Sequence, residues 1–256
     1  MIERYSTVTA KKESHFVLKQ AVHESEIEAA LRLRFEVFNI EMNEGLQSSY
    51  QTGLDYDEFD SLCDHIIVKD EERNEVVGTY RLLLGSTAEK AHGYYSEMEF
   101  EMSAFKKLQG EKLELGRACV HKDYRGSAVL TLMWSGIAGY IDAYDIDHIF
   151  GCGSVHTINP AVISSIYGYF KKNYLTAEDC RATPLKRVPG FDACDALDKR
   201  LIAQHLPPLL GAYLRLGARV AGEPAFDEQF GVSDFLILLD RDKLLSRYKD
   251  RFFSVR

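Results

Sequence analysis

Apolar residues recur along this chain at two different spacings, one typical of helices and one typical of strands. From residue 24 to residue 38 the spacing is helical, and Ser25, three positions before Glu28, predicts a capping box at the helix start. The same helical spacing predicts a short helix at 102–108 and longer ones at 129–142, 159–172 and 207–216.

Short apolar runs with strand character lie between these helices. Residues 65–68 and 76–84 flank a charged turn and predict a hairpin, and further strands are predicted at 112–120, 148–155, 219–221 and 234–239. From 112 to 155 the order is strand, turn, helix, strand, which is a β-loop-α-β unit. We therefore expect an α/β (α+β) fold with a mixed sheet flanked by helices and additional helices towards the C-terminus. No repeat or linker divides 1–256, which predicts one domain with an insertion or extension at about 173–205.

The strand predicted at 112–120 carries both an acid and a base. In a regular strand Glu114 and Arg117 point to opposite faces, because successive side chains alternate. The two side chains meet only if Gly116 introduces a bulge. The sequence leaves a regular strand and a bulge equally open.

Composition and charge limit the possible functions. The chain is 46% hydrophobic and 27% charged, as folded soluble proteins are, and its formal net charge of −8 argues against a nucleic-acid partner. The most apolar long segment, 129–141, has about a dozen residues and is too short to span a bilayer. Peripheral membrane contact stays open, because exposed amphipathic surface can provide it.

Cysteine usage and the start of the chain bear on its compartment. The cysteines are odd in number and never spaced as CxxC, and the first residues are polar and charged rather than a secretory signal. Both observations predict a cytoplasmic protein, with peripheral attachment to the inner face of the cytoplasmic membrane as an option. The cysteines are Cys63, Cys119, Cys152, Cys180 and Cys194.

The turn at 124–128 lies between a predicted strand and a predicted helix. Backbone N–H groups and the positive end of the helix dipole attract phosphate at such a place, and Arg125 adds a charged fork. An ordinary polar turn is the simpler interpretation of this pentapeptide alone. The sequence shows no nucleotide-binding fingerprint and no calcium or zinc pattern, so we expect no metal.

Three arginines stand among apolar neighbours, which is unusual because arginine is seldom buried without a partner. The candidate counter-charges are Asp57, Asp60 and Glu114. A buried network of this kind can be structural or can bind a substrate, and the sequence leaves both interpretations open. The arginines are Arg34, Arg81 and Arg117.

These residues occur in an order that resembles a known family, the acyl-carrier-protein-dependent branch of the GNAT acyltransferases, which includes the acyl-homoserine-lactone synthases. The segments that carry the resemblance are 34–38, 57–60, 78–83, 114–117 and 124–125. The chain more closely resembles the ornithine-acyl-carrier-protein N-acyltransferases of ornithine-lipid synthesis, sometimes described as hemolysin-like. Segments specific to that similarity are 63–65, 150–152, 206–209, 213–218 and 222–225.

The resemblance implies a GNAT fold, in which a mixed sheet is splayed between its middle strands and admits a phosphopantetheine arm. It implies no permanently bound cofactor, since the co-substrate is the acyl-phosphopantetheine of acyl-carrier protein or acyl-CoA. Backbone amides of Ala118 and Val120 would bind the pantetheine. The donor phosphate would lie at the turn and contact Arg125, Gly126, Ser127 and Ala128.

The implied reaction transfers a long-chain fatty acyl group to the α-amine of an amino acid, with ornithine favoured. Glu114 would act as the base, and Arg117 would share the catalytic centre by binding the acceptor carboxylate or organising the acidic loop. Tyr167 could protonate the thiolate, although helix packing is the favoured interpretation. The acceptor would contact Arg34, Phe38, Asp57, Asp60 and Arg81.

Two other functions are alternatives to this N-acyltransferase activity. An autoinducer synthase would use S-adenosylmethionine, but the lactone synthases carry a tryptophan before their acidic motif, and here the only tryptophan is Trp134. A non-enzymatic, membrane-associated hemolysin-like protein is disfavoured because no long apolar or amphipathic segment could line a pore. The acceptor, the acyl length and the choice between carrier protein and CoA stay open. For an acidic carrier protein we expect a basic patch formed by Lys106, Lys107, Lys122, Arg125, Lys171 and Lys172.

Overall fold

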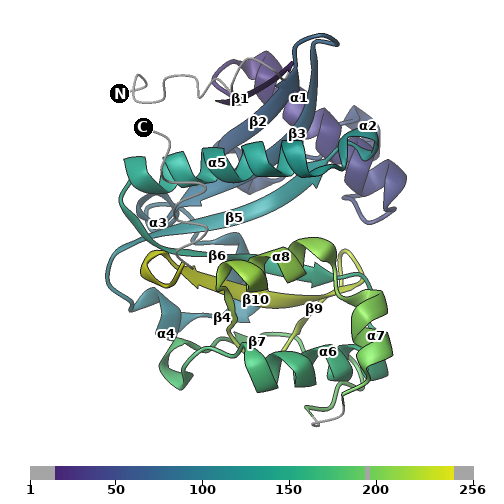
Figure 1. Ribbon diagram of the computed structural model, residues 1–256, viewed down its shortest axis with the longest axis vertical. Coiled ribbons are helices and arrows are strands. Elements are labelled where there is room, and N and C mark those ends of the chain that lie inside the picture. The colour runs from purple at the N-terminus through teal and green to yellow at the C-terminus, as the bar shows by residue number, and fades with distance from the viewer. Residues whose placement is uncertain (1–14, 194–196, 245–256) are drawn as a thin grey trace.

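A mixed sheet of eight strands organises the molecule, and a computed structural model describes residues 15–193 and 197–244 (Figure 1). The polar start of the chain and Cys194 lie outside the described residues. The strands are β1 (Phe16–Gln20), β2 (Asp64–Asp70), β3 (Glu75–Leu84), β5 (Glu111–Val120), β6 (Ile146–Val155), β8 (Arg219–Val220), β9 (Ala225–Asp227) and β10 (Val232–Asp240). Their order is β1-β2-β3-β5-β6-β10-β8, with β9 paired to β10. Among the described strands of this sheet, β5 and β6 alone pair with each other in parallel, as the predicted β-loop-α-β unit requires.

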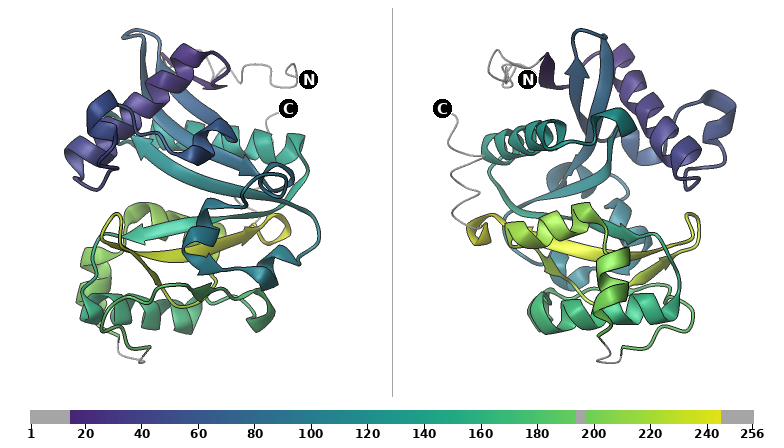
Figure 2. Two further views of the ribbon diagram at one scale, coloured as in Figure 1. Left: turned by 180° about the vertical axis from the view of Figure 1, so that it is seen from behind. Right: turned by 45° about the vertical axis from the view of Figure 1, so that its right-hand side comes forward.

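Helices cover both faces of this sheet. The helices α5 (Ser127–Ala143), α6 (Pro160–Asn173) and α8 (Pro208–Leu216) share one apolar core with the strands. On the other face α1 (Glu24–Arg34) packs Leu33 close to Cys119 of β5. Figure 1 shows α5 and α8 in front of the sheet, and the left view of Figure 2, from behind, shows α1 in front.

The first helix differs from the expectation at both ends. Its N-cap is His23, whose amide donates to the Glu26 carboxylate, so the capping box predicted on Ser25 and Glu28 is wrong. At its other end the helix continues as a π-helical turn, η1 (Phe35–Glu41). Such turns are frequent at functional sites.

The segment 173–205, expected to be an insertion or extension, forms short elements. It contains η5 (Glu178–Cys180), β7 (Thr183–Pro184) and α7 (Lys199–His205). A second, two-stranded sheet forms where β7 pairs with β4 (Phe100–Glu101). The remaining short elements are α2 (Ser49–Thr52), η2 (Glu58–Ser61), α3 (Gly85–Ala88), η3 (Tyr95–Met98), α4 (Ser103–Lys106), η4 (Lys122–Tyr124) and η6 (Arg241–Lys243).

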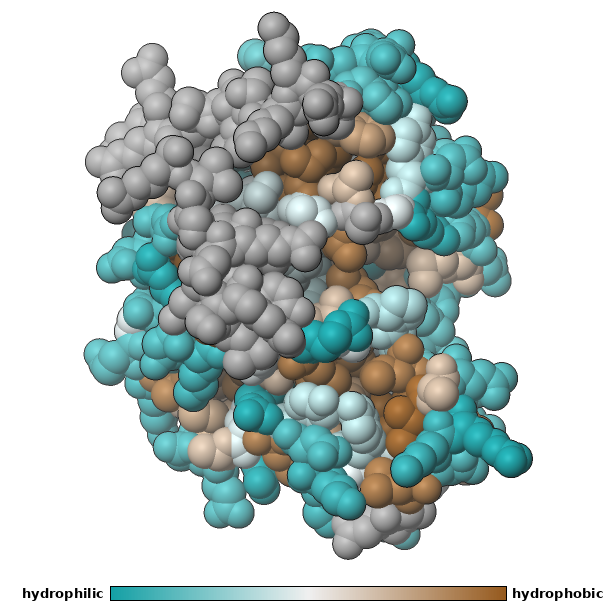
Figure 3. All heavy atoms as spheres, in the orientation of Figure 1, coloured by the Kyte–Doolittle hydropathy of each residue, from teal (hydrophilic) through white to brown (hydrophobic). Residues whose placement is uncertain are grey.

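Among the described residues, no helix combines the length and the apolar character needed to cross a bilayer. The face that carries α5 and α8 shows separate apolar patches among polar ones (Figure 3).

Candidate functional site

The parallel strands β5 and β6 pair over only part of their length. Their pairing ends at Glu114 and Phe150, whereas β5 stays paired with β3 as far as Val120 and β6 with β10 as far as Val155. The sheet therefore forks beyond Glu114 into two ribbons, whose ends lie apart in Figure 1. The splay that the resemblance implies is present.

A β-bulge interrupts β5 just beyond the fork. The register between β3 and β5 shifts by one residue, so that Arg117 and Ala118 stand opposite a single residue of β3. Arg117 has a φ of 50°, in the left-handed region that arginine rarely adopts. The bulge is thus the alternative that forms, and it brings Arg117 and Glu114 to the lining of the same cleft.

The fork holds a cleft of about 620 Å³, a volume within the range of small-molecule sites. Both ribbons, η1 and the start of α8 contribute to its walls. Of the residues selected from the sequence, those that line it are Phe38, Arg81, Glu114, Arg117, Ala118, Val120 and Arg125.

A chain of alternating arginines and aspartates lies behind the cleft wall. The fully buried Arg34 donates to Asp55 at 2.7 Å and to the two oxygens of Asp60 at 2.5 and 3.1 Å. Burial alone would raise the pKa of Asp60, but Arg34 and Arg81 lower it to about 2. The Asp60 carboxylate is therefore ionised, and its oxygens are already occupied by arginine donors. In order of contact the members are Arg117, Asp55, Arg34, Asp60, Arg81 and Asp57.

Glu114, one of the candidate counter-charges for the arginines, stands outside this network. Its buried carboxylate accepts hydrogen bonds from the Tyr95 amide at 2.8 Å, the Ser96 amide at 2.7 Å and the Ser96 hydroxyl at 2.5 Å. Burial raises the pKa of Glu114, and these hydrogen bonds offset only part of that effect. The sequence named Glu114 as a counter-charge, and Asp55, which it did not name, has that role.

The turn before α5 presents an uncapped helix start. Gly126 is the N-cap without a side-chain hydrogen bond, and a Cβ there would meet no atom within 4 Å, so the approach to the amides of Ser127 and Ala128 is open. Arg125 donates to both oxygens of Glu41, at 2.5 and 2.6 Å. Its guanidinium is therefore paired to η1 across the mouth of the cleft.

The free edge of β5 faces the fork. The His121 amide donates to the Val77 carbonyl on β3, so the amides of Val120 and Ala118, which alternate with it, are directed to the opposite edge. That edge borders the cleft beyond Glu114. Both backbone groups selected from the sequence thus lie where an extended ligand could pair with the strand.

Comparison with known proteins gives the family. Residues 33–135 match the model of the acetyltransferase (GNAT) domain. The L-ornithine N(alpha)-acyltransferase of Brucella abortus is 36% identical over 87% of this chain and 83% of that protein. The enzyme of the same name from Rhodobacter capsulatus is 33% identical over 94% of this chain and 95% of that protein. The chain belongs to the family of L-ornithine Nα-acyltransferases. It is an acyltransferase.

Solved structures confirm the fold of this acyltransferase. FeeM, an N-acyl amino acid synthase from uncultured soil microbes, superposes with a TM-score of 0.51 at 12% identity, over 91% of this chain and 97% of FeeM. The acyl-homoserine-lactone synthase LasI gives a TM-score of 0.51 at 13% identity, over 94% of this chain and 95% of LasI. The predicted GNAT-like arrangement is therefore confirmed.

Sequence patterns missed a group of buried acids at the cleft. Asp227 and Asp234 line it, and Glu99 lies within reach of both, so that the three carboxylates form a group with the geometry of a possible cation site. The only signal for Asp234 was an acid in an otherwise apolar strand segment. Glu99 and Asp227 lay in short polar stretches without a recognisable pattern.

Two further side chains, Cys152 and Tyr167, could take part in chemistry at the cleft. Cys152 lines the cleft and donates to the Ser96 hydroxyl, and burial raises its pKa well above the ordinary value, so it is a neutral thiol rather than a nucleophile. Tyr167 is buried in the core and stacks edge-on against Phe191 at 5.4 Å. Helix packing, the favoured interpretation of Tyr167, is confirmed.

Lys106, one of the six basic residues expected to contact a carrier protein, lies on a different part of the molecule from the turn with Lys122 and Arg125. Lys106 ends α4 and pairs with Glu97 at 2.6 Å. Figure 1 shows α4 at the lower left, whereas β5 leads into the start of α5 on the right. Of these residues Arg125 lines the cleft, and Lys122 lies three positions before it.

Proposed function

We propose that this acyltransferase moves a long-chain fatty acyl group from a phosphopantetheine thioester to the α-amine of ornithine, in aminolipid biosynthesis. The observation that carries the proposal is the forked sheet, whose cleft is lined by Glu114 and Arg117. The names of the curated relatives support ornithine as the acceptor.

The donor enters between the two ribbons in this proposal. The free edge of β5 supplies the amides of Ala118 and Val120 to the pantetheine, in the manner of an added strand. The start of α5, with Gly126, Ser127 and Ala128, receives the phosphate, because uncapped amides and the helix dipole favour an anion there. Arg125 leaves Glu41 to pair with it. Both acyl-carrier protein and acyl-CoA present this chemistry.

The acceptor amine attacks the thioester carbonyl from the floor of the cleft. Glu114 removes the proton from the ammonium, and its raised pKa suits a base that works near neutral pH. The new C–N bond replaces the C–S bond, and the pantetheine thiolate leaves and takes up a proton.

Arg117 is the group best placed for the acceptor carboxylate. One of its nitrogens pairs with Asp55, but its buried Nε has no hydrogen-bond partner among the described residues. Its guanidinium also lies over the rings of Phe38 at 4.8 Å and Phe230 at 5.2 Å. Phe38 thus holds Arg117 in place, and Arg34, Asp57, Asp60 and Arg81 fix the wall behind it.

Residues around the cleft mouth favour two partners, an acidic carrier protein and a membrane surface. Lys122 and Arg125 lie at the donor entrance and would contact an acidic carrier protein. Ile40 is 61% exposed beside Glu41, which pairs with Arg125 at this mouth, and would contact the membrane that receives the lipid product. Ile40→Glu should then reduce co-sedimentation with anionic vesicles, and unchanged co-sedimentation would exclude this contact.

The test is an acyl-transfer assay with purified protein. Acyl-carrier protein or CoA carrying a long-chain acyl group is mixed with ornithine, and mass spectrometry identifies the product and the amine that is acylated. We expect N-acylornithine modified at the α-amine. S-Adenosylmethionine in place of ornithine tests for autoinducer synthesis, and a homoserine lactone product without acylornithine would refute the proposal.

A further inference from the structure

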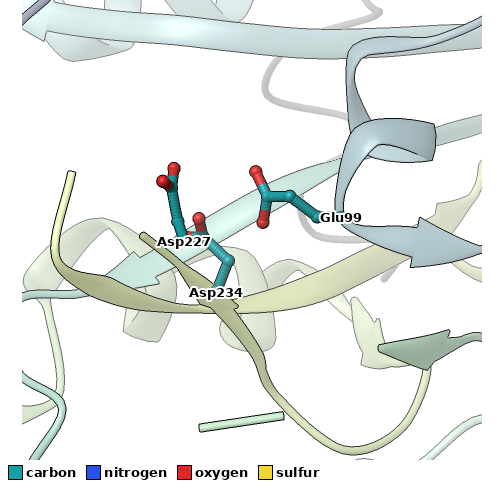
Figure 4. Close-up of side chains that lie close together, drawn as sticks. All are labelled: Glu99, Asp227 and Asp234. Carbon is teal, nitrogen blue, oxygen red and sulfur yellow. The ribbon is translucent and has the colours of Figure 1, made fainter. Parts of the chain in front are cut away.

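Three buried acids meet beside the cleft, and two of them, Asp227 and Asp234, line it. Glu99 precedes β4, Asp227 ends β9 and Asp234 lies in β10, yet one oxygen of each lies within 4.8 Å of those of the other two. Figure 4 shows their carboxyl groups directed toward one another. Their residues are only 9%, 8% and 2% exposed, respectively. Segments distant in the sequence thus bring negative charge to one buried point.

These acids have no basic partner of their own. Glu99 and Asp234 share a hydrogen bond with each other, and Asp234 also bonds the Ser154 side chain. No basic group among the described residues donates to either oxygen of Glu99 or to Oδ1 of Asp234. The nearest basic groups that act on them, Arg117 and His156, form ion pairs elsewhere, with Asp55 and with Glu44 at 2.8 Å. By contrast, each aspartate of the Arg/Asp network forms an ion pair with at least one arginine.

Burial without a basic partner changes the ionisation of these acids. Burial and the neighbouring Asp234 raise the pKa of Glu99 to about 10, and burial raises that of Asp234 to about 6. At neutral pH the group therefore retains a proton and is only partly charged. A buried site of this kind is complementary to a small cation that brings its own hydrogen-bond donors.

The position of the three acids beside Arg117 indicates which kind of cation they would bind. Asp227 and Asp234 line the same cleft as Arg117, and Phe230, which stacks on Arg117, donates its amide to Asp227 at 3.0 Å. The hairpin β9–β10 thus joins a site for a carboxylate to a site for a cation. A basic amino acid has both groups, and a terminal ammonium has three N–H donors for three carboxyl groups.

We propose that Glu99, Asp227 and Asp234 bind the side-chain ammonium of ornithine while Arg117 holds its α-carboxylate. This assignment rests on the proposed acyl transfer to ornithine. The three acids orient the acceptor so that its α-amine, and not its side-chain amine, faces Glu114 and the thioester. An acceptor without a side-chain amine leaves them unpaired, which makes them the specificity determinant.

The test compares ornithine with norvaline, which has the same carbon chain without the terminal amine. Wild-type protein should favour ornithine in kcat/KM by roughly 100-fold or more, because buried polar groups left unpaired penalise the analogue. Glu99→Gln and Asp234→Asn should reduce kcat/KM for ornithine roughly 10- to 100-fold, as expected for a lost hydrogen bond to a charged group, and leave norvaline unchanged or improved.

Controls separate this role from structural and metal-binding ones. The side chain of Glu178 is 90% exposed, so Glu178→Gln is a matched variant that should change neither substrate. Equal losses for ornithine and norvaline would overturn the proposal, as would wild-type activity that EDTA abolishes and Mg²⁺ restores. Acylation of ornithine and norvaline at equal rates would overturn the proposed side-chain subsite but leave the proposed acyl transfer intact. Acyl transfer to no amino acid would refute the proposed function itself, and the subsite with it.

Discussion

The carbonyl oxygen of Leu115 lies so close to Gly151 that a Cβ at position 151 would stand 2.2 Å from it. This contact lies where β5 and β6 separate. The Leu115 carbonyl and the Gly151 backbone both belong to the sheet, so neither strand can move aside easily. Gly151→Ala should therefore push the strands apart and reduce the free energy of unfolding by roughly 1–3 kcal/mol, as overpacking does. It should also raise the KM for the acyl donor. Thermal denaturation and steady-state kinetics measure the two effects.

Gly139 in α5 provides the matched control. A Cβ there meets no atom within 4 Å, and alanine is the better helix former, so Gly139→Ala should stabilise the protein by up to about 1 kcal/mol. A Gly151→Ala protein with wild-type melting temperature and donor KM would show that the close approach does not shape the fork.

The fork illustrates what the sequence could predict. The strand–turn–helix–strand pattern indicated β5, α5 and β6, because each has strong local periodicity. The edge strand β1 and the polar helix α7 were missed, since short or polar elements form through tertiary contacts that local patterns do not record. The bulge at Arg117 was left open for the same reason.

The candidate site, like the fold, could be predicted only in part. Arg34, Arg81 and Arg117 could be selected because a charge among apolar neighbours needs a partner. Their partners could not be assigned from spacing alone, and Asp55 took the place expected for Glu114. Glu99 meets Asp234 across a large separation in the chain, so only the folded backbone brings this pair together.

Ser96 allows the role of Glu114 as a base to be tested. The hydroxyl of Ser96 donates to the Glu114 carboxylate and lowers its pKa, against burial, which raises it. Ser96→Ala removes a bond that stabilises the charged form, so the pKa of Glu114 should rise further. The acidic limb of the kcat/KM pH profile should then move to higher pH, and activity at pH 6 should fall more than at pH 9.

Ser135→Ala is the control, because that hydroxyl donates only to the Leu132 carbonyl within α5. It should leave the pH profile unchanged. An acidic limb that stays in place in Ser96→Ala would mean that the limb reports a group other than Glu114.

Glu41 competes with the donor for Arg125. Because Glu41 holds the guanidinium through two hydrogen bonds, an incoming phosphate must displace it. Glu41→Gln should therefore lower the donor KM roughly 2- to 5-fold, the scale of a partly exposed ion pair, whereas Arg125→Ala should raise it. Kinetics at varied acyl-donor concentration decide this, and a higher KM in Glu41→Gln would instead show that Glu41 positions Arg125 for binding.

Even the conservative substitution Arg117→Lys should weaken acceptor binding. Arg117→Lys keeps a positive charge near Asp55 but loses the guanidinium Nε and the planar stacking on Phe38. We expect the KM for ornithine to rise roughly 10-fold or more while the donor KM stays the same, since a hydrogen bond to a charged ligand is lost. A change confined to the donor KM would place the acceptor carboxylate elsewhere.

The titration of the buried acids Glu99 and Asp234 should lower the free energy of unfolding as pH rises. The pKa of Glu99, raised to about 10 by burial and Asp234, and that of Asp234, raised to about 6 by burial, exceed the ordinary values of 4.5 and 3.8. The folded protein therefore retains protons that the unfolded chain releases, so the stability they contribute is complete below about pH 4 and is lost as pH rises to 6 and on to 10.

Glu99→Gln removes this titration. The melting temperature of the variant should exceed that of wild type at pH 9, where the gain is roughly 1–3 kcal/mol, and the gain should shrink towards pH 5. Glu178→Gln should follow wild type at every pH. Melting curves that stay parallel from pH 5 to 9 would show that Glu99 is not held protonated by its surroundings. A variant that gains stability while losing its preference for ornithine over norvaline would show that these acids serve the acceptor rather than the fold.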